Sequence, residues 1–121
     1  MTSPNLDLPM LYGFALGEMI SCHDGVCCYR ATRRDTEQQY ILKVISIPQN
    51  DGDIDEMYND GYDDESITST FQSHLKSIVA EYSLMRKMNG CTNIVNCDDI
   101  RYIQHEDGIG WDIFIKMELL M

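Results

Sequence analysis

The spacing of apolar residues between positions 71 and 85 constrains the fold more than any other feature of the sequence. These residues recur at intervals of four, three, four and three, which places them in one stripe along an α-helix: Phe71, Leu75, Ile78, Tyr82 and Met85. Gly90 follows the last of them and is typical of a helix C-terminus. Glu81 borders the stripe, and burying an unpaired carboxylate is costly, so we expect it to have a cationic partner.

Three segments before this helix have the patterns of β-strands. Residues 12–16 alternate between larger and smaller side chains, residues 26–31 form a second short strand, and residues 40–47 form a third that Pro48 ends. The links between them, 21–25 and 32–36, are short and polar. Because short links join antiparallel neighbours, the three segments predict an antiparallel meander.

Two more strand-like segments follow the helix, at residues 94–104 and 111–120. The segment between them contains Asp107 and Gly108 in succession, a frequent hairpin turn. The expected order is therefore three strands, one helix and two strands. An antiparallel sheet of five strands with one main helix on one face belongs to the α+β class.

The acidic residues of the chain are concentrated in one segment. The 121 residues include 20 acids and 9 bases, a formal net charge of −11, and eight of the acids lie between Asp51 and Glu65. We interpret residues 48–66 as an acidic insertion between the third strand and the helix, with a short helix around residues 53–59. The net charge argues against a nucleic-acid or membrane partner, since both attract basic surfaces.

The five cysteines have neither a disulfide-framework nor a zinc-binding spacing: Cys22, Cys27, Cys28, Cys91 and Cys97. Residues 1–7 carry no base and no apolar run, and no stretch has the roughly 18 apolar residues of a membrane-spanning helix. These features predict a cytoplasmic protein with reduced thiols. The three histidines are scattered and support no nucleophilic triad.

The order of the elements, with a lysine in the third strand and a glutamate in the helix, resembles the N-terminal lobe of a protein kinase. Residues 40–43 (Tyr-Ile-Leu-Lys) are similar to the V-A-I-K strand of kinases, and residues 80–85 (Ala-Glu-Tyr-Ser-Leu-Met) to helix αC. Residues 114–120 look like the fifth strand running into the hinge. More narrowly, residues 47–49, 93–95 and 105–115 are similar to bacterial eukaryote-like Ser/Thr protein kinases of the Firmicutes type.

The resemblance implies two catalytic residues. Lys43 would contact the phosphates of ATP, and Glu81 would pair with the lysine and hold it against them. Met117 takes the gatekeeper position, and Glu118 and Leu120 would present backbone groups to adenine. The resemblance assigns five further positions to nucleotide binding: Leu16, Gly17, Gly25, Cys28 and Ile41.

The glycine-rich loop departs from the family pattern. One alignment with G-x-G-x-x-G puts Ser21, His23 and Val26 at the glycine positions, and another uses Gly17 and Gly25 as the outer glycines with three extra residues between them. Glycines at these positions let backbone amides approach phosphate closely. Two interpretations therefore stay open: an ATP-binding kinase lobe, and a non-catalytic pseudokinase-like or regulatory binding module.

The sequence contains no H-R-D, D-F-G or A-P-E motif, so the catalytic Asp and the Mg²⁺ ligands of a kinase would lie in a C-lobe outside this chain. We interpret residues 1–10 as an N-terminal tail and residues 11–121 as an N-lobe cut at its hinge. The expected partners are ATP with Mg²⁺, the kinase's own C-lobe and a Ser/Thr protein substrate. The isolated chain is expected to be inactive, and its bare face to favour self-association.

Overall fold

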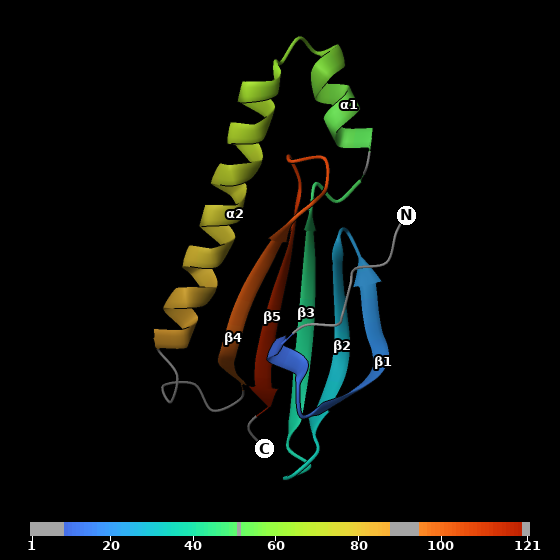
Figure 1. Ribbon diagram of the computed structural model, residues 1–121, viewed down its shortest axis with the longest axis vertical. Helices are drawn as coiled ribbons and strands as arrows, with labels where there is room; N and C mark the ends of the chain where they lie inside the picture. The colour runs from blue at the N-terminus through green and yellow to red at the C-terminus, as the bar shows by residue number, and fades with distance from the viewer. Residues whose placement is uncertain (1–8, 51, 88–94, 120–121) are drawn as a thin grey trace.

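The computed structural model describes residues 9–50, 52–87 and 95–119. The elements, whose arrangement Figure 1 shows, are η1 (Pro9–Leu11), β1 (Phe14–His23), β2 (Val26–Arg33), β3 (Gln39–Ile47), α1 (Gly52–Asn59), α2 (Asp64–Lys87), β4 (Val95–Gln104) and β5 (Trp111–Leu119). The strand order is β1-β2-β3-β5-β4, and every neighbouring pair is antiparallel. The expected α+β class and five-stranded antiparallel sheet are confirmed.

The two C-terminal strands do not join the sheet in chain order. β5 lies beside β3, and β4 lies outside β5 at the edge of the sheet. The chain leaves β3, runs through α1 and the long helix α2, and returns as β4 (Figure 1). This order makes β3 and β5 interior strands, so side chains in the middle of both are shielded by strands on two sides.

The sheet face that packs on α2, which we call the helix face, carries the larger core. Ile47, Ile113 and Ile115 lie on this face and are at most 3% exposed. The helix contributes four buried side chains to the same cluster: Ile67, Phe71, Leu75 and Tyr82. Burying a large aliphatic or aromatic side chain contributes roughly 1.5–3 kcal/mol, so this cluster fixes α2 on the sheet.

α2 begins seven residues before the stripe that identified it in the sequence. The Asp63 carboxylate accepts a 2.8 Å hydrogen bond from the backbone N–H of Ser66, as an N-cap residue does, and this bonding lowers the pKa of Asp63. Ile67 lies four residues before Phe71, extends the stripe by one turn and is fully buried. The end of the acidic segment 48–66 is thus the first turn of α2, while α1 matches the short helix expected at 53–59.

The last residue of the predicted stripe is not part of the core. Phe71, Leu75 and Tyr82 are buried and Ile78 is half-buried, but Met85 is 40% exposed. α2 packs mainly on β4, the edge strand of the sheet. Among the described residues no strand lies beyond β4, and Met85 near the end of the helix stays partly exposed.

The link expected at residues 21–25 is in fact a two-residue turn. β1 continues to His23, which lies opposite Val26 on β2. Asp24 and Gly25 between them have φ angles of 55° and 77°. Positive φ at both turn positions suits the twist of a tight hairpin, and the Asp-Gly pair is well adapted to it. The first strand is therefore longer than the sequence indicated.

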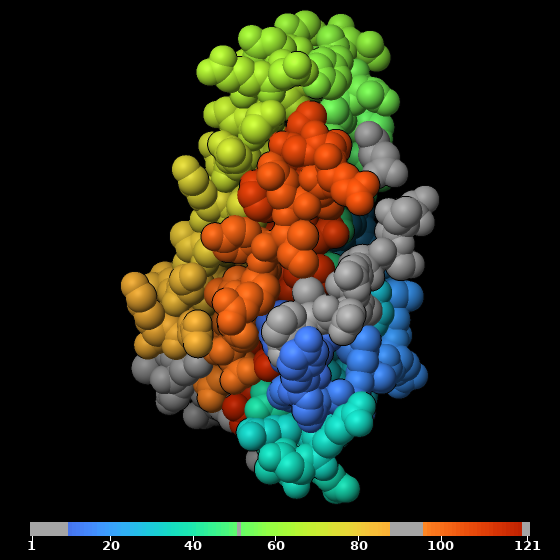
Figure 2. Space-filling view, in the orientation of Figure 1, coloured from blue at the N-terminus to red at the C-terminus, as the bar shows by residue number. Residues whose placement is uncertain are grey.

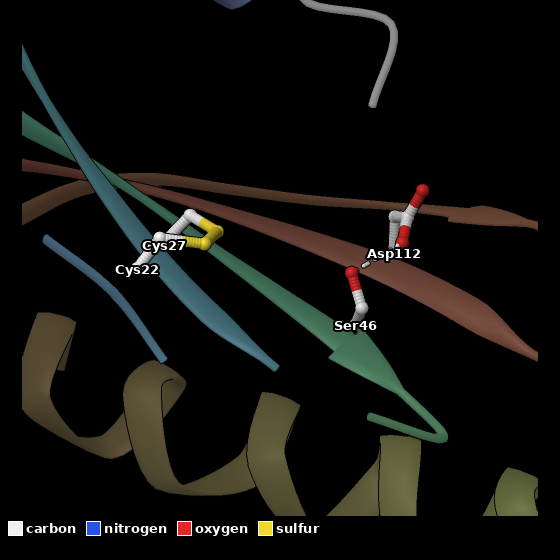
Figure 3. The surroundings of a disulfide bond; sticks show 4 residues. All are labelled: Cys22, Cys27, Ser46 and Asp112. Atoms are coloured by element: carbon white, nitrogen blue, oxygen red, sulfur yellow. Dashed lines mark hydrogen bonds between the residues drawn. A yellow bond between two sulfur atoms is a disulfide. The ribbon is translucent and has the colours of Figure 1, made fainter. Parts of the chain in front are cut away.

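This hairpin joins two cysteines, so the expectation that all five are reduced thiols is wrong. Cys22 and Cys27 lie directly opposite each other on β1 and β2, with Cα atoms 4.0 Å apart, and form a disulfide (Figure 3). The pairing depends on the hairpin register, which makes these residues cross-strand neighbours. Cys28 on the same hairpin forms no disulfide, and burial raises the pKa of the Cys97 thiol.

The opposite face of the sheet, which we call the outer face, carries a smaller core of four buried residues: Met10, Leu42, Val44 and Phe114. Beside it, Lys116 is only 6% exposed. Its ammonium donates a 2.6 Å hydrogen bond to the Met10 carbonyl oxygen, lies 3.1 Å from the Asp98 carboxylate, and sits 4.2 Å from the centroid of the Phe14 ring. A buried ammonium is tolerated only with partners of this kind.

β4 is an edge strand, and no other strand in the described part of the chain pairs with its outer side. In Figure 2 its atoms, coloured orange, lie between α2 on the left and the blue η1 segment below. Tyr102 and Ile103 on this strand are 51% and 46% exposed. Within the described part of the chain, neither helix combines the length and the apolar composition that crossing a membrane requires.

Candidate functional site

Lys43 lies in the middle of β3, the central strand of the sheet. Its cross-strand neighbours are Cys28 on β2 and Ile115 on β5. Residues directly opposite each other share a face, and Ile115 belongs to the helix-face core. The side chains of Lys43 and Cys28 therefore project towards the side of the sheet that α2 covers.

The ammonium of Lys43 contacts Tyr82 of α2. Lys43 Nζ donates a 2.6 Å hydrogen bond to the Tyr82 hydroxyl oxygen and lies 5.3 Å from the centroid of its ring. Tyr82 is 9% exposed and Lys43 is half-buried. The phenol oxygen thus supplies the acceptor that a partly buried ammonium needs. The sequence placed Tyr82 in the apolar stripe. Its hydroxyl group was the feature that could have identified it as part of the site, because a buried tyrosine hydroxyl needs a hydrogen-bond partner.

Glu81 does not take part in this contact. Its side chain is exposed, and among the described residues it forms no ion pair within 4.0 Å. Consecutive helix residues point about 100° apart, so when Tyr82 faces the sheet Glu81 is turned aside. The expected cationic partner is therefore not in place in this structure. The exposed carboxylate does not need one, because it is solvated.

Three further predicted positions lie beside Lys43 on the helix face. Ile41 precedes Lys43 by two residues, so strand alternation places it on the same face, and it lies opposite Met117. Cys28 lies opposite Lys43. All three side chains are half-buried. An ammonium beside an apolar surface is suited to an anion that carries an apolar or aromatic group.

Two predicted positions face away from the lysine. Leu16 lies opposite Ala31, is 40% exposed and shares the outer face with it. Glu118 lies opposite Tyr40, and burial, followed by the nearby Glu118 carboxylate, raises the pKa of Tyr40. The side chains of Leu16 and Glu118 do not join the lysine. Leu120 lies outside the described residues.

The two glycines assigned to nucleotide binding lie where backbone segments approach each other closely, Gly17 within the β1–β2 hairpin and Gly25 between the hairpin and the end of β3. A Cβ atom at Gly17 would lie 3.3 Å from the carbonyl oxygen of Arg30. At Gly25 it would lie 2.9 Å from Cα of Gln49, and the Gly25 carbonyl accepts a 2.8 Å hydrogen bond from Ser46. Both glycines therefore allow backbone contacts that a side chain would disturb.

A serine, an aspartate and a histidine meet at one end of the sheet. Ser46 Oγ donates a 2.9 Å hydrogen bond to Asp112 Oδ1 (Figure 3), and His105 Nε2 lies 2.9 Å from the same oxygen. In a nucleophilic triad the histidine stands between the serine and the carboxylate. Here the carboxylate stands between the other two, so the histidine is not positioned to take the serine proton. The cluster joins β3, β5 and the β4–β5 loop.

The fold and this site together define a small α+β domain in which a central-strand lysine faces one long helix. Among the residues that the structure describes, no three His, Cys, Asp or Glu side chains are grouped to hold a metal ion. No protein-family model matches the chain, and a search of curated proteins gives no significant match.

Proposed function

We propose that this chain is the ATP-binding N-terminal lobe of a Ser/Thr protein kinase, similar to the bacterial eukaryote-like kinases. The observation that carries the proposal is the position of Lys43. It lies on the central strand of a five-stranded antiparallel sheet, on the face that the long helix α2 covers, and α2 follows β3 and precedes β4 in the chain. A kinase N-lobe uses a lysine on its third strand and a glutamate on the following helix in the same way.

In this proposal, Lys43 binds the α- and β-phosphates of ATP as a point charge. Cys28, Ile41 and Met117 would form the apolar surface against adenine, since they are half-buried beside the lysine on one face. The hairpin that contains Gly17 and Gly25 would cover the phosphates. Backbone groups of Glu118 and Leu120 would meet the adenine edge.

The remaining parts of the reaction would come from a C-lobe. It would supply the aspartate that accepts the substrate hydroxyl proton and the residues that bind Mg²⁺. By the same reasoning, this chain alone transfers no phosphate to a Ser/Thr protein substrate.

The contact between Lys43 and Tyr82 adds a requirement to the proposal. For Glu81 to reach Lys43, the part of α2 that carries it has to turn towards the sheet, since Glu81 points about 100° away from Tyr82 around the helix axis. That rotation would break the 2.6 Å hydrogen bond between Lys43 and Tyr82. The proposed catalytic pair therefore belongs to a second position of α2, in which Tyr82 has left the lysine.

One observation favours the alternative, a non-catalytic binding module. Lys43 already has a hydrogen-bond partner in Tyr82, while Glu81 is exposed and lies in no ion pair among the described residues. A lobe whose helix stays in this position does not use Glu81 to hold the lysine against phosphate.

Calorimetric titration of the purified chain with Mg·ATP tests the proposal. Lys43→Met is expected to weaken binding at least about tenfold, because one charge-assisted contact to phosphate is worth roughly 1.5–3 kcal/mol. Lys76→Met, which removes an exposed lysine of α2, serves as the matched control and should leave the affinity unchanged. Absence of Mg·ATP binding, or equal binding by wild type and Lys43→Met, would overturn the proposal and favour the binding module.

A further inference from the structure

The disulfide between Cys22 and Cys27 lies at an accessible tip of the molecule. Cys22 is exposed and Cys27 is half-buried. The two residues flank the tight turn at Asp24 and Gly25, with only the His23 and Val26 pair between them and the turn. A reagent in solution can therefore reach the bond without unfolding the sheet.

The bond joins an edge strand to the rest of the sheet. β1 pairs with β2 alone, and its register is irregular between Leu16 and Met19 and again between Met19 and Ser21. On the other side, Cys27 lies opposite Val44, which is 1% exposed in the outer-face core. The disulfide thus fastens the least regular strand at its far end, next to a well-packed part of β3.

The fold does not depend on this bond for its closure. The two cysteines are five residues apart in sequence, and the Asp24–Gly25 turn already brings them together. A disulfide stabilises mainly by restricting the unfolded chain, and a short loop that its own turn closes leaves little to restrict. The sheet can therefore persist when the bond opens, as a reversible reaction site requires.

We propose that Cys22 and Cys27 form a thiol–disulfide exchange site whose reaction partner is a dithiol. One thiolate of the dithiol attacks Sγ of the exposed Cys22, the Sγ–Sγ bond breaks, and Cys27 leaves as a thiolate. The second thiolate of the dithiol then attacks the dithiol sulfur that is bound to Cys22 in the mixed disulfide, and Cys22 leaves as a thiolate. Two electrons pass to the protein, both cysteines take up protons, and the dithiol becomes a cyclic disulfide.

The third cysteine of the hairpin does not replace either partner. Cys28 follows Cys27 directly, so strand alternation turns it to the helix face, opposite Lys43. Exchange is thus confined to the outer-face pair. Cys28 serves as an internal reference in any measurement of the site.

Trypsin cleaves after lysine and arginine, and the first of either in the chain is Arg30. Residues 1–30 therefore form one tryptic peptide, which carries three cysteines: Cys22, Cys27 and Cys28. The folded chain is equilibrated with reduced and oxidised dithiothreitol, quenched with acid, denatured, alkylated with iodoacetamide and digested with trypsin. Mass spectrometry of this peptide should find one alkyl group in the oxidised protein and three after exchange. The far-UV circular dichroism should stay unchanged throughout.

Two variants identify the reacting pair. Cys28→Ser should lower both counts by one and keep the difference of two, whereas Cys22→Ser should give two alkyl groups under every condition. Amide exchange in the hairpin of the reduced wild type should accelerate about tenfold, because the far end of β1 opens more often.

Three alkyl groups in the protein before any reduction would overturn the proposal. Reduction of the Cys22–Cys27 disulfide only after denaturant has unfolded the sheet would also overturn it. The alkylation counts do not depend on nucleotide binding. A chain that exchanges but binds no Mg·ATP would retain this site and lose only the proposed kinase function.

Discussion

The ammonium of Lys43 donates a 2.6 Å hydrogen bond to the phenol oxygen of Tyr82, and not to the carboxylate of Glu81, the preceding residue of α2. The two residues differ in burial, since Tyr82 lies in the apolar stripe and Glu81 is exposed. Packing of the stripe on the sheet therefore decides which polar group of the helix reaches the lysine. Any state in which Glu81 replaces Tyr82 has to repack this part of the helix face.

Removal of the phenol oxygen should destabilise the domain. In Tyr82→Phe the ring still fills its place, but the partly buried Lys43 ammonium loses its acceptor. We expect the free energy of unfolding to fall by about 1–2 kcal/mol, measured by urea denaturation. Tyr62→Phe, at a tyrosine that is 51% exposed, should change it by less than about 0.5 kcal/mol. Equal stability of Tyr82→Phe and wild type would show that the hydrogen bond contributes nothing.

Replacing the buried Lys116 with an apolar residue should cost less stability than removing the carboxylate that neutralises it. Asp98→Ala leaves the ammonium buried without its carboxylate, and we expect a loss of about 2–4 kcal/mol. Lys116→Met replaces the ammonium with an apolar side chain of similar length and leaves a carboxylate that is 40% exposed, so the loss should be only about 1–2 kcal/mol.

The double variant separates the two effects on Lys116 and Asp98. Once Met occupies position 116, the carboxylate has no buried charge to neutralise. The double variant should therefore be no less stable than Asp98→Ala alone, measured by the same urea denaturation. Additive losses from the two substitutions would contradict a coupled pair.

The first turn of α2 should contribute to stability, because it carries a residue of the helix-face core. Ile67 is fully buried among residues of the helix-face core, so Ile67→Ala should cost about 2–5 kcal/mol. Leu84→Ala on the same helix removes a side chain that is 59% exposed and should cost less than about 0.5 kcal/mol. Thermal unfolding followed at 222 nm would compare them, and similar costs would mean that this turn is frayed in solution.

The cap of α2 should make stability depend on pH in the acid range. Hydrogen bonds from Ser66 hold the pKa of Asp63 below its ordinary value of 3.8. The carboxylate therefore stabilises the folded state above about pH 4, and this contribution is lost as the pH falls through the lowered pKa. Asp63→Asn keeps an acceptor that does not titrate, so its stability should decline less than that of wild type between pH 5 and about pH 2.

A neighbouring acid supplies the control for this pH dependence. The Asp60 carboxylate accepts no hydrogen bond from the described residues. Asp60→Asn should therefore follow the wild-type decline in urea titrations at each pH. A decline of Asp63→Asn as steep as that of wild type would show that the cap does not contribute.

Local patterns predicted the secondary structure well. Alternation identified the strands, Asp107 with Gly108 marked a hairpin, and the helical spacing of the stripe identified α2. The errors lie at the ends of elements. The start of α2 was hidden because an acidic cap and an acidic first turn resemble a solvated connector, although Asp63 and Ile67 are a cap and a core residue.

By itself, the sequence determined the types and order of the elements, because hydrophobic periodicity and turn residues act over short distances. Only the tertiary structure decided which residues meet. Cys22 joins Cys27 because of the hairpin register, and Lys43 meets Tyr82 because of the rotation of α2 on the sheet. Register and helix rotation are set by packing between segments far apart in the chain, and a pattern within one segment cannot encode them.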